Sequence, residues 1–425
     1  MLFRNIGFAT TQSVSSIYQI ADLDYRTRIG TWAGAPGPYA FITASFTYDA
    51  GQSTPVSGTS GSIDLHTQIK GCLLKADGTV NYYLNATDWT KKEDNTTSVL
   101  TGADGNVMVE IPKFYVSASM TGTGGTRVVT YFVTADSAAL NSGYIVHPAF
   151  YRSGSEVDYR YIGAYIASGY SGSGAVVTAT GALATGSSNN ILRSVSGSAP
   201  ISSRPMSDHR QLARNIGNNW GLLDYYLLNA VDLLFLSEYK TLDTQTAIGV
   251  GAGSNTTIAG GSTAYANRST PTGYVGNQRY RGIEGLTGVG MQWIDGILMT
   301  KDNPILVYST NNQQYFNDTS IANYIKMSGS ISVSGTGFYS GDYIIKVPTG
   351  SLNLANGVQI IPSEGGGSST TKFTDFMYSP ISYPNVLYMN YCRGTNNNGT
   401  AGGWFYAETN ERLRSDAYVV ARLAY

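Results

Sequence analysis

The stretch that decides the fold begins with Asn385-Val-Leu-Tyr-Met-Asn-Tyr-Cys-Arg-Gly-Thr395 and closes with Tyr418-Val-Val-Ala-Arg-Leu-Ala-Tyr425. Between these runs lie Asn396-Asn-Asn-Gly399, which predicts a turn, and Gly402-Gly-Trp-Phe-Tyr406. The β-formers in the flanking runs predict strands, and the closing strand carries one arginine in an apolar setting. Aromatic rings supply rigid contact area while Asn, Ser and Gly supply adaptable hydrogen bonds, a mixture typical of binding loops. The stretch therefore predicts a binding surface.

Composition favours a strand-rich and loop-rich protein. Charged residues make up 13% of the 425 residues, against about 25% in an ordinary globular chain. The chain holds 50 Gly and 32 Tyr, too many aromatics for a disordered polyelectrolyte and too many turn residues for a helical bundle. We therefore expect an α+β protein dominated by strands.

Charge and hydropathy exclude two classes of partner. The net charge is −1 and no Lys/Arg run exceeds Lys91-Lys92, so no basic footprint for nucleic acid exists. The N-terminal residues lack the pattern of a signal peptide, and no stretch approaches the ~20 apolar residues of a membrane span. We expect neither nucleic-acid binding nor membrane insertion.

The two cysteines do not make a disulfide framework. Cys72 and Cys392 lie far apart in the sequence, and two cysteines cannot form the dense disulfide framework of a small secreted domain. A bridge between them is one alternative, and free buried thiols are the favoured one.

Residues 1–62 form a separate composition block that closes with a Gly/Ser/Thr run over 51–62. We interpret this block as an N-terminal β region that serves attachment. From residue 63 the sequence predicts three features: a hairpin of 68–74 and 80–84 around a type I′ turn at Asp77-Gly78, a strand over 105–116 with Pro112 at an edge or bulge, and a strand over 126–133.

Two helices follow. Ser207 is predicted to cap a helix over 208–216, which Gly217 ends in the left-handed conformation. A second helix is predicted from about Trp220 to Lys240, with one buried face, because apolar residues recur at three- and four-residue spacing. A polar Gly/Ser/Thr/Ala/Asn loop covers 249–276, a strand covers 292–298, and a β-rich insert covers about 327–370.

Several local runs resemble a known family. They are Asp88-Trp-Thr-Lys-Lys92, Met108-Val-Glu-Ile-Pro-Lys-Phe-Tyr115, His147-Pro-Ala-Phe150, Tyr161-Ile-Gly-Ala-Tyr165, Arg279-Tyr-Arg-Gly-Ile-Glu284 and Gly402-Gly-Trp404. The chain is similar to phage tail and virion proteins with a C-type-lectin-like domain, such as the major tropism determinant and the variable proteins of diversity-generating retroelements. Formylglycine-generating enzymes share that fold. The likeness covers roughly 63–296 and the last forty residues.

The resemblance implies a C-type-lectin-like domain over 63–425, in which a twisted antiparallel sheet carries two helices. It also implies a homotrimer, a buried acidic residue at Glu238, and a binding face on the final strands. Its implied site residues are Tyr388, Asn390, Tyr391, Arg393, Thr395, Asn396, Asn397, Asn398, Trp404, Tyr406, Glu408, Asn410 and Arg412. Alternatives remain open: Tyr388 and Trp404 also fit a core, and the asparagines also fit a hairpin turn without a ligand.

The sequence contains few residues arranged for catalysis or metal binding. The three histidines, His66, His147 and His209, show no metal-ligand spacing, and each fits a core or turn role. Formylglycine-generating enzymes use a cysteine pair near the end of the domain, where this chain has Cys392 alone. The Glu-Pro-Asn and Trp-Asn-Asp strings of calcium-dependent lectins are absent. We therefore expect no catalytic residues, no metal and no cofactor.

Together these features predict a phage receptor-binding protein or tail adhesin, displayed on the virion after assembly in the host cytoplasm. It would hold other virion proteins through residues 1–62 and recognise a bacterial surface protein or glycan through the C-terminal face. The alternative is a structural decoration or fibre component of the head or tail. A glycan hydrolase ranks last, because it would need two carboxylates facing each other across a groove.

Overall fold

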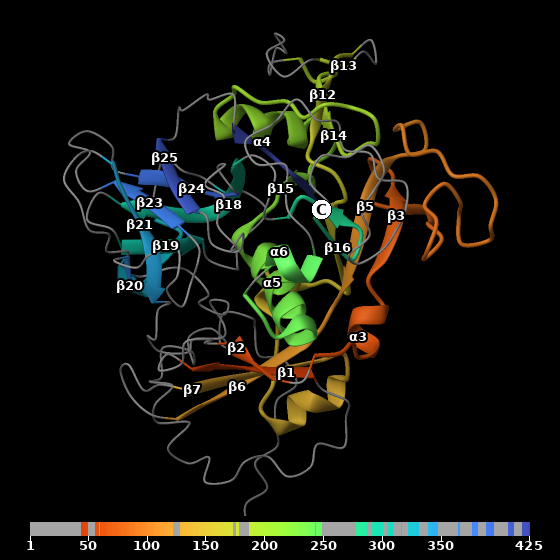
Figure 1. Ribbon diagram of the computed structural model, residues 1–425. Coiled ribbons are helices and arrows are strands. Elements are labelled where there is room, and N and C mark those ends of the chain that lie inside the picture. The colour runs from red at the N-terminus through yellow and green to blue at the C-terminus, as the bar shows by residue number, and fades with distance from the viewer. Residues whose placement is uncertain are drawn as a thin grey trace, which may run out of the picture.

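The computed structural model describes the following residues: 44–49, 56–58, 60–121, 128–172, 176–177, 187–242, 244–248, 278–286, 291–300, 304–308, 316, 322–330, 339–346, 364–365, 376–380, 388–394, 407–411 and 419–425. Three larger sheets surround a central helix, with shorter helices at the periphery (Figure 1). The prediction of a strand-dominated α+β chain is confirmed.

A five-stranded antiparallel sheet joins early and middle parts of the chain. Its order is β2 (Val56–Ser57), β1 (Ala44–Asp49), β7 (Val128–Thr134), β6 (Tyr115–Thr121) and β8 (Ile145–Val146). The strand predicted over 126–133 is confirmed as β7. Strand β1 belongs to the predicted N-terminal region yet pairs along its whole length with β7, so elements on both sides of the predicted boundary at residue 62 share one sheet.

A six-stranded sheet lies beside the central helix. Its order is β15 (Gly221–Leu222), β27 (Leu423–Ala424), β11 (Tyr159–Gly163), β5 (Asn106–Pro112), β3 (Lys70–Leu74) and β4 (Val80–Tyr83). Because side chains alternate along each strand, one face supplies Leu73, Val109 and Ile162 to the main core, and the other supplies Cys72 and Met108 to a second core.

The single strand predicted over 105–116 is wrong. It is two strands, β5 and β6, which belong to different sheets. Pro112 is the last residue of β5, where its missing N–H costs no further ladder bond, and it lies neither at a sheet edge nor in a bulge. The chain changes sheet between Pro112 and Tyr115.

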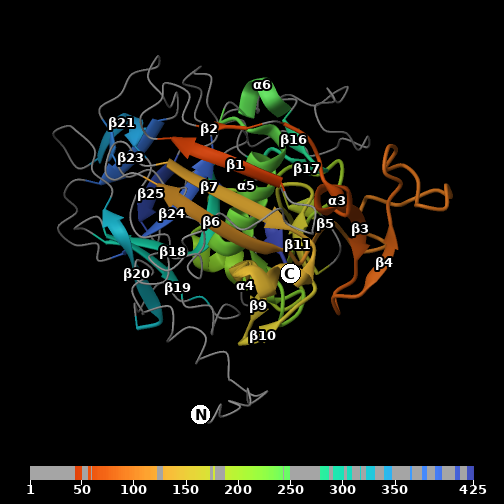
Figure 2. The ribbon, with the colours of Figure 1, turned by 90° about the horizontal axis from the view of Figure 1, so that it is seen from below.

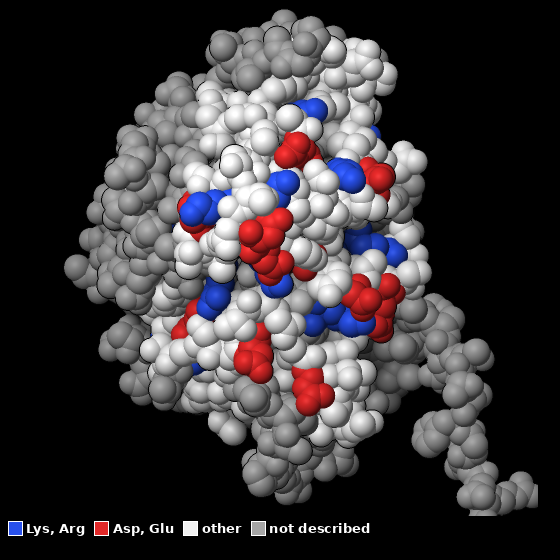
Figure 3. All heavy atoms as spheres, turned by 90° about the vertical axis from the view of Figure 1, so that its right-hand side faces the viewer, with Lys and Arg blue, Asp and Glu red and all other residues white. Residues whose placement is uncertain are grey.

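The β3–β4 hairpin is confirmed, but its turn is not type I′. Gly78 has a φ of +85°, while Asp77 is not among the residues with positive φ. The Gly78 N–H donates to the Lys75 carbonyl and the Lys75 N–H donates to the Thr79 carbonyl. This is a type I turn closed by a left-handed glycine, the usual three-residue hairpin loop. Residues 75–98, here the β3–β4 arm, extend from the molecule, and acidic and basic side chains are interspersed on the face that carries it (Figure 3).

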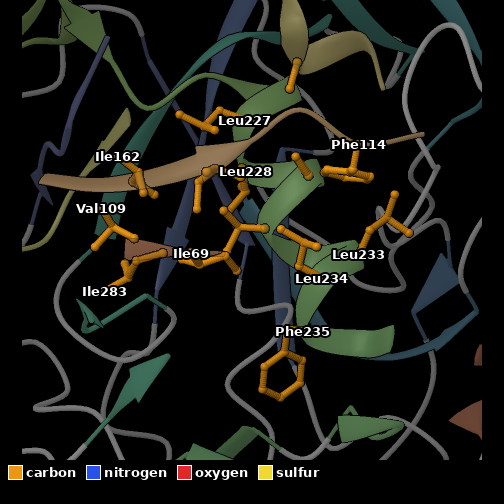
Figure 4. Close-up of a cluster of buried hydrophobic side chains, with 14 of the residues drawn as sticks. Ile69, Val109, Phe114, Ile162, Leu227, Leu228, Leu233, Leu234, Phe235 and Ile283 are labelled. Carbon is orange, nitrogen blue, oxygen red and sulfur yellow. The ribbon is translucent and has the colours of Figure 1, made fainter. Parts of the chain in front are cut away.

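Helix α5 (Tyr225–Tyr239) forms the centre of the molecule. It contacts β1, β7 and β18, and Figure 2 shows β1 and β7 crossing it. The prediction of a helix from Trp220 with one buried face is wrong on both points. Gly221–Leu222 form strand β15, Asp224 caps the helix by accepting from the Leu227 N–H, and every residue from Tyr225 to Glu238 is buried. Because protein surrounds the helix, apolar side chains on more than one of its faces pack into the core (Figure 4).

Helix α4 (Met206–Arg214) covers the other face of the six-stranded sheet. The predicted cap at Ser207 is wrong, because the helix begins at Met206, two residues before the predicted start, and Pro205 occupies the N-cap position. The predicted left-handed end at Gly217 is also wrong, since Asn215 closes the helix in a right-handed conformation.

A nine-stranded sheet contains the described strands from the predicted insert and from the predicted binding face. Along it run β20 (Tyr324–Ser330), β19 (Pro304–Tyr308), β18 (Met291–Thr300), β24 (Tyr388–Gly394), β25 (Ala407–Glu411), β23 (Phe376–Pro380), β21 (Tyr339–Lys346) and β22 (Glu364–Gly365), while β26 (Val419–Val420) pairs with β18. The strand predicted over 292–298 is confirmed as part of β18. The loop predicted over 249–276 lies outside the described residues.

Smaller elements complete the described chain. They are the helices α3 (Asp64–Thr67) and α6 (Thr244–Ile248), the 3-10 turns Ser137–Ser142 and Pro148–Phe150, and the strands β9 (Tyr151–Arg152), β10 (Ser155–Glu156), β12 (Ser168–Tyr170), β13 (Val176–Val177), β14 (Ile191–Arg193), β16 (Arg279–Tyr280) and β17 (Ile283–Glu284). No helix among the described residues is both long and apolar enough to span a bilayer.

Candidate functional site

The predicted binding residues fall on two paired strands and on segments beyond the described part of the chain. Strand β24 carries Tyr388, Asn390, Tyr391 and Arg393, and β25 carries Glu408 and Asn410. The remaining seven, which lie outside the described residues, are Thr395, Asn396, Asn397, Asn398, Trp404, Tyr406 and Arg412. The site as a whole stays a prediction.

The register divides the described candidates between the two sides of the sheet. Asn390 lies opposite Asn410, and Tyr391 lies opposite Thr409. Since successive strand positions alternate between sides, positions 390, 408 and 410 belong to one side, and positions 391 and 393 belong to the other. One flat ligand on one side of the sheet therefore cannot meet all of these positions.

A bulge in β18 interrupts its pairing with β24, the neighbouring strand of the sheet. Ile294 pairs with Tyr391, but the next pair is Leu298 with Asn390, so residues 295–297 form the bulge. Gly296 occupies its left-handed position with φ +73°. The bulge places the Asp295 carboxylate against α4, where it accepts from Arg210 Nε at 2.9 Å and Nη2 at 2.8 Å. A buried bidentate ion pair thus fixes the strand on which the candidate site rests.

Arg422 ties the end of the described chain to the same strand. Its Nε donates to Gln292 Oε1 at 2.9 Å, and its Nη1 donates to the Gly163 carbonyl at 2.7 Å. Nη2 donates to the Glu284 and Gly285 carbonyls. The side chain is fully buried. The predicted buried arginine is therefore confirmed, and it joins β11, β17 and β18 to the segment between β26 and β27.

A second buried pair lies where the six-stranded sheet meets β18. Arg160 Nη2 donates to Asp224 Oδ2 at 2.6 Å, and both side chains are 1% exposed. The Leu223 N–H donates to the Arg422 carbonyl and the Asp295 N–H donates to the Leu223 carbonyl, so the two sheets are hydrogen-bonded at this point.

Glu238 is buried, as the resemblance implied. Its carboxylate accepts from Ser62 Oγ at 2.6 Å and from Arg281. The Arg281 and Gly282 φ values, +47° and +87°, form the tight turn between β16 and β17. Hydrogen bonds from Ser62 and Arg281 lower the pKa of the Glu238 carboxyl against the effect of its burial.

The three histidines are fully buried and have structural partners, as predicted. His147 Nδ1 accepts from the Ala149 N–H and its Nε2 faces Asn229 Oδ1 at 3.1 Å. His66 Nδ1 accepts from the Ile63 N–H, and the ring nitrogens of His209 face backbone carbonyls. Burial lowers the pKa of His147 to about 3 and those of His66 and His209 to about 4. Cys72 is a free, buried thiol whose pKa burial raises well above its usual value, which confirms the favoured reading for this cysteine.

Sequence reasoning missed the arginine–aspartate pairs. One signal was available for Asp295, an acidic residue beside a glycine inside the apolar run Gln292-Trp-Ile-Asp-Gly-Ile-Leu298, because a charge in a buried strand requires a partner. Nothing in the sequence indicates that Arg210, 85 residues away, is that partner.

No group of three or more His, Cys, Asp or Glu side chains within the described ranges is arranged to hold a metal ion. Comparison with known protein families finds no family model that matches the chain, and a search of curated proteins finds no significant match.

Proposed function

We propose that this chain is a phage virion protein that binds a receptor on the bacterial surface through the β24–β25 strands and the segments that follow them. The observation that carries the proposal is the placement of β24 on β18. Tyr, Asn and Arg positions suited to recognition lie on a strand whose neighbour is held by a buried bidentate ion pair.

The finer fold belongs to the same proposal. A C-type-lectin-like domain has a twisted antiparallel sheet with two helices. Three features support that assignment: helix α5, helix α4, and strand β27 between β11 and β15. We further propose a homotrimer that holds other virion proteins through residues 1–62, with avidity from the copy number on the particle.

The test is binding of purified protein to intact cells of candidate hosts. The test variant changes Tyr391, Arg393, Asn397 and Tyr406 to alanine. A matched control changes four residues of the exposed β3–β4 arm, Lys91, Lys92, Asp94 and Asn95, to alanine. Both variants are first compared with the parent protein by thermal melt, so that a loss of binding is not a loss of folding.

Loss of binding in the first variant alone, with an unchanged melt, would support the proposed face. Binding that survives both sets of changes would contradict it and move the site elsewhere on the chain. Absence of binding by the parent protein on every host tested would favour the alternative, a structural decoration or fibre component of the virion.

A further inference from the structure

A small pocket opens beside the two buried arginine–aspartate pairs. Its lining includes Arg152, Arg210, Arg214, Trp220, Asp295 and Phe316. The volume of the cavity is about 10 Å³, which is room for one water molecule or an ion of similar size. Three arginines and one aspartate therefore border a space that holds a single small occupant.

The two carboxylates of the region are already engaged. Asp295 gives both oxygens to Arg210, and Oδ1 also accepts from the Gly296 N–H. Asp224 gives Oδ1 to the Leu227 N–H and Oδ2 to Arg160. Each carboxylate therefore already accepts hydrogen bonds from one arginine and from one backbone N–H.

Arg152 is the second arginine on Asp224. Its Nη1 lies 3.9 Å from Asp224 Oδ2, beyond hydrogen-bond distance, while Arg160 holds the same oxygen at 2.6 Å. Arg152 Nη2 donates to the Asn219 carbonyl at 3.2 Å, a neutral acceptor. The Arg152 side chain is only 17% exposed, and burial together with the nearby Arg160 charge lowers its pKa to about 9. An anion next to it would offset both effects.

We propose that this pocket is a binding site for one small monovalent anion, held by Arg152 with Arg210 and Arg214 at its border. The ligand is a compact negative charge small enough for this pocket, a free halide such as chloride. Guanidinium groups form strong charge-assisted hydrogen bonds with such a charge. This site is separate from the β24–β25 strands and does not depend on the proposed receptor function.

The test is a thermal-melt titration of the full chain at constant ionic strength. Sodium chloride replaces sodium acetate or sodium methanesulfonate, whose anions are both larger than the pocket. We expect a saturable rise in Tm with chloride and none with acetate or methanesulfonate. In Arg152→Gln the apparent Kd should rise at least about tenfold, as expected for loss of a charge-assisted hydrogen bond. Asp224 retains Arg160 in this variant, so the fold should persist.

Lys113→Gln is the control, because Lys113 pairs with Glu156 and Asp158 on the surface. It should respond to anions as the parent does. Crystals grown in bromide supply a second measurement, an anomalous peak beside Arg152. Equal melts in all three salts, or a response that Arg152→Gln leaves unchanged together with no bromide peak in the pocket, would overturn the proposal.

Discussion

Aspartates in the buried centre of the molecule form ion pairs with distant residues, whereas aspartates in the β3–β4 arm bond to residues nearby in the sequence. In the centre, Asp224 and Asp295 are at most 1% exposed, and each pairs with an arginine from a distant part of the chain. In the arm, Asp88 is half-buried and Asp94 is exposed. Both bond locally, to the Thr two residues ahead, and Asp88 also pairs with Lys91.

The same local hydrogen-bond pattern recurs along the arm. Asp77, Asn85, Asp88 and Asp94 each accept from both the backbone N–H and the hydroxyl of a Thr at the second following position. These bonds lower the pKa of the three aspartates. Local bonds shape a turn, whereas distant pairs join sheets, so we expect changes in the two regions to differ widely in their effect on stability.

The largest effect is expected for Arg422→Met. The change removes the Arg422 donor of the buried Gly163 and Glu284 carbonyls and of Gln292 Oε1, and each such loss costs about 1–3 kcal/mol. The Ala164 and Gly285 carbonyls keep the Glu284 N–H and Gln292 Nε2 as donors. The free energy of unfolding should fall by more than about 4 kcal/mol, measured by urea denaturation, or the protein should fail to accumulate in soluble form.

Arg193→Met is the matched control for that change. Arg193 is half-buried, donates to the Gly102 carbonyl at 2.6 Å and lies over the Tyr170 ring. Its loss should cost about 1 kcal/mol. Equal costs for the two arginines would contradict the idea that the centre depends on distant polar bonds more than the periphery does.

An intermediate effect is expected on acidification. The folded-state pKa values of His66, His147 and His209 lie below 6.5, so the unfolded chain binds more protons and stability falls as pH drops below 6.5. Each histidine should contribute about 1.4 kcal/mol per pH unit between pH 6 and 5. Glu110, whose pKa burial raises, acts in the opposite direction.

Urea midpoints measured at pH 7, 6 and 5 test this expectation. His147→Gln should reduce the slope by about a third, since one of three titrating groups is removed. A free energy of unfolding that stays constant from pH 7 to pH 5 would show that the histidines are accessible to protons in the folded state.

The smallest effect is expected for Asp94→Ala in the arm. The change removes two bonds to Thr96 in an exposed turn, so Tm should shift by no more than about 1 °C. A loss comparable to that of Arg422→Met would mean that the arm is integral to the core. Thermal melts of the parent and the variant, run side by side at pH 7, decide between these outcomes.

Much of the local structure was predictable from the sequence, because its causes are local. The turn signal at Asp77-Gly78 indicated β3 and β4, a run of β-formers indicated β7, and the apolar setting of Arg422 indicated its burial. Asp224 could have been recognised as a helix cap, but the apolar run before it concealed the short strand β15. The bulge at Gly296 and the Arg210–Asp295 pair depend on contacts between distant segments, which no local pattern contains. The candidate site rests on family resemblance for the same reason.

The position of β27 has a consequence for synthesis. This strand fills the place between β11 and β15, and Arg160 bonds to a residue 265 positions later in the chain. During translation, β11 therefore leaves the ribosome with an unpaired edge long before β27, the strand that pairs with this edge, has been synthesised. Closing so long a loop is entropically slow, and an open apolar edge attracts other chains in the meantime. We expect the nascent chain to complete its fold only after translation has passed residue 424, and to need protection from aggregation until then.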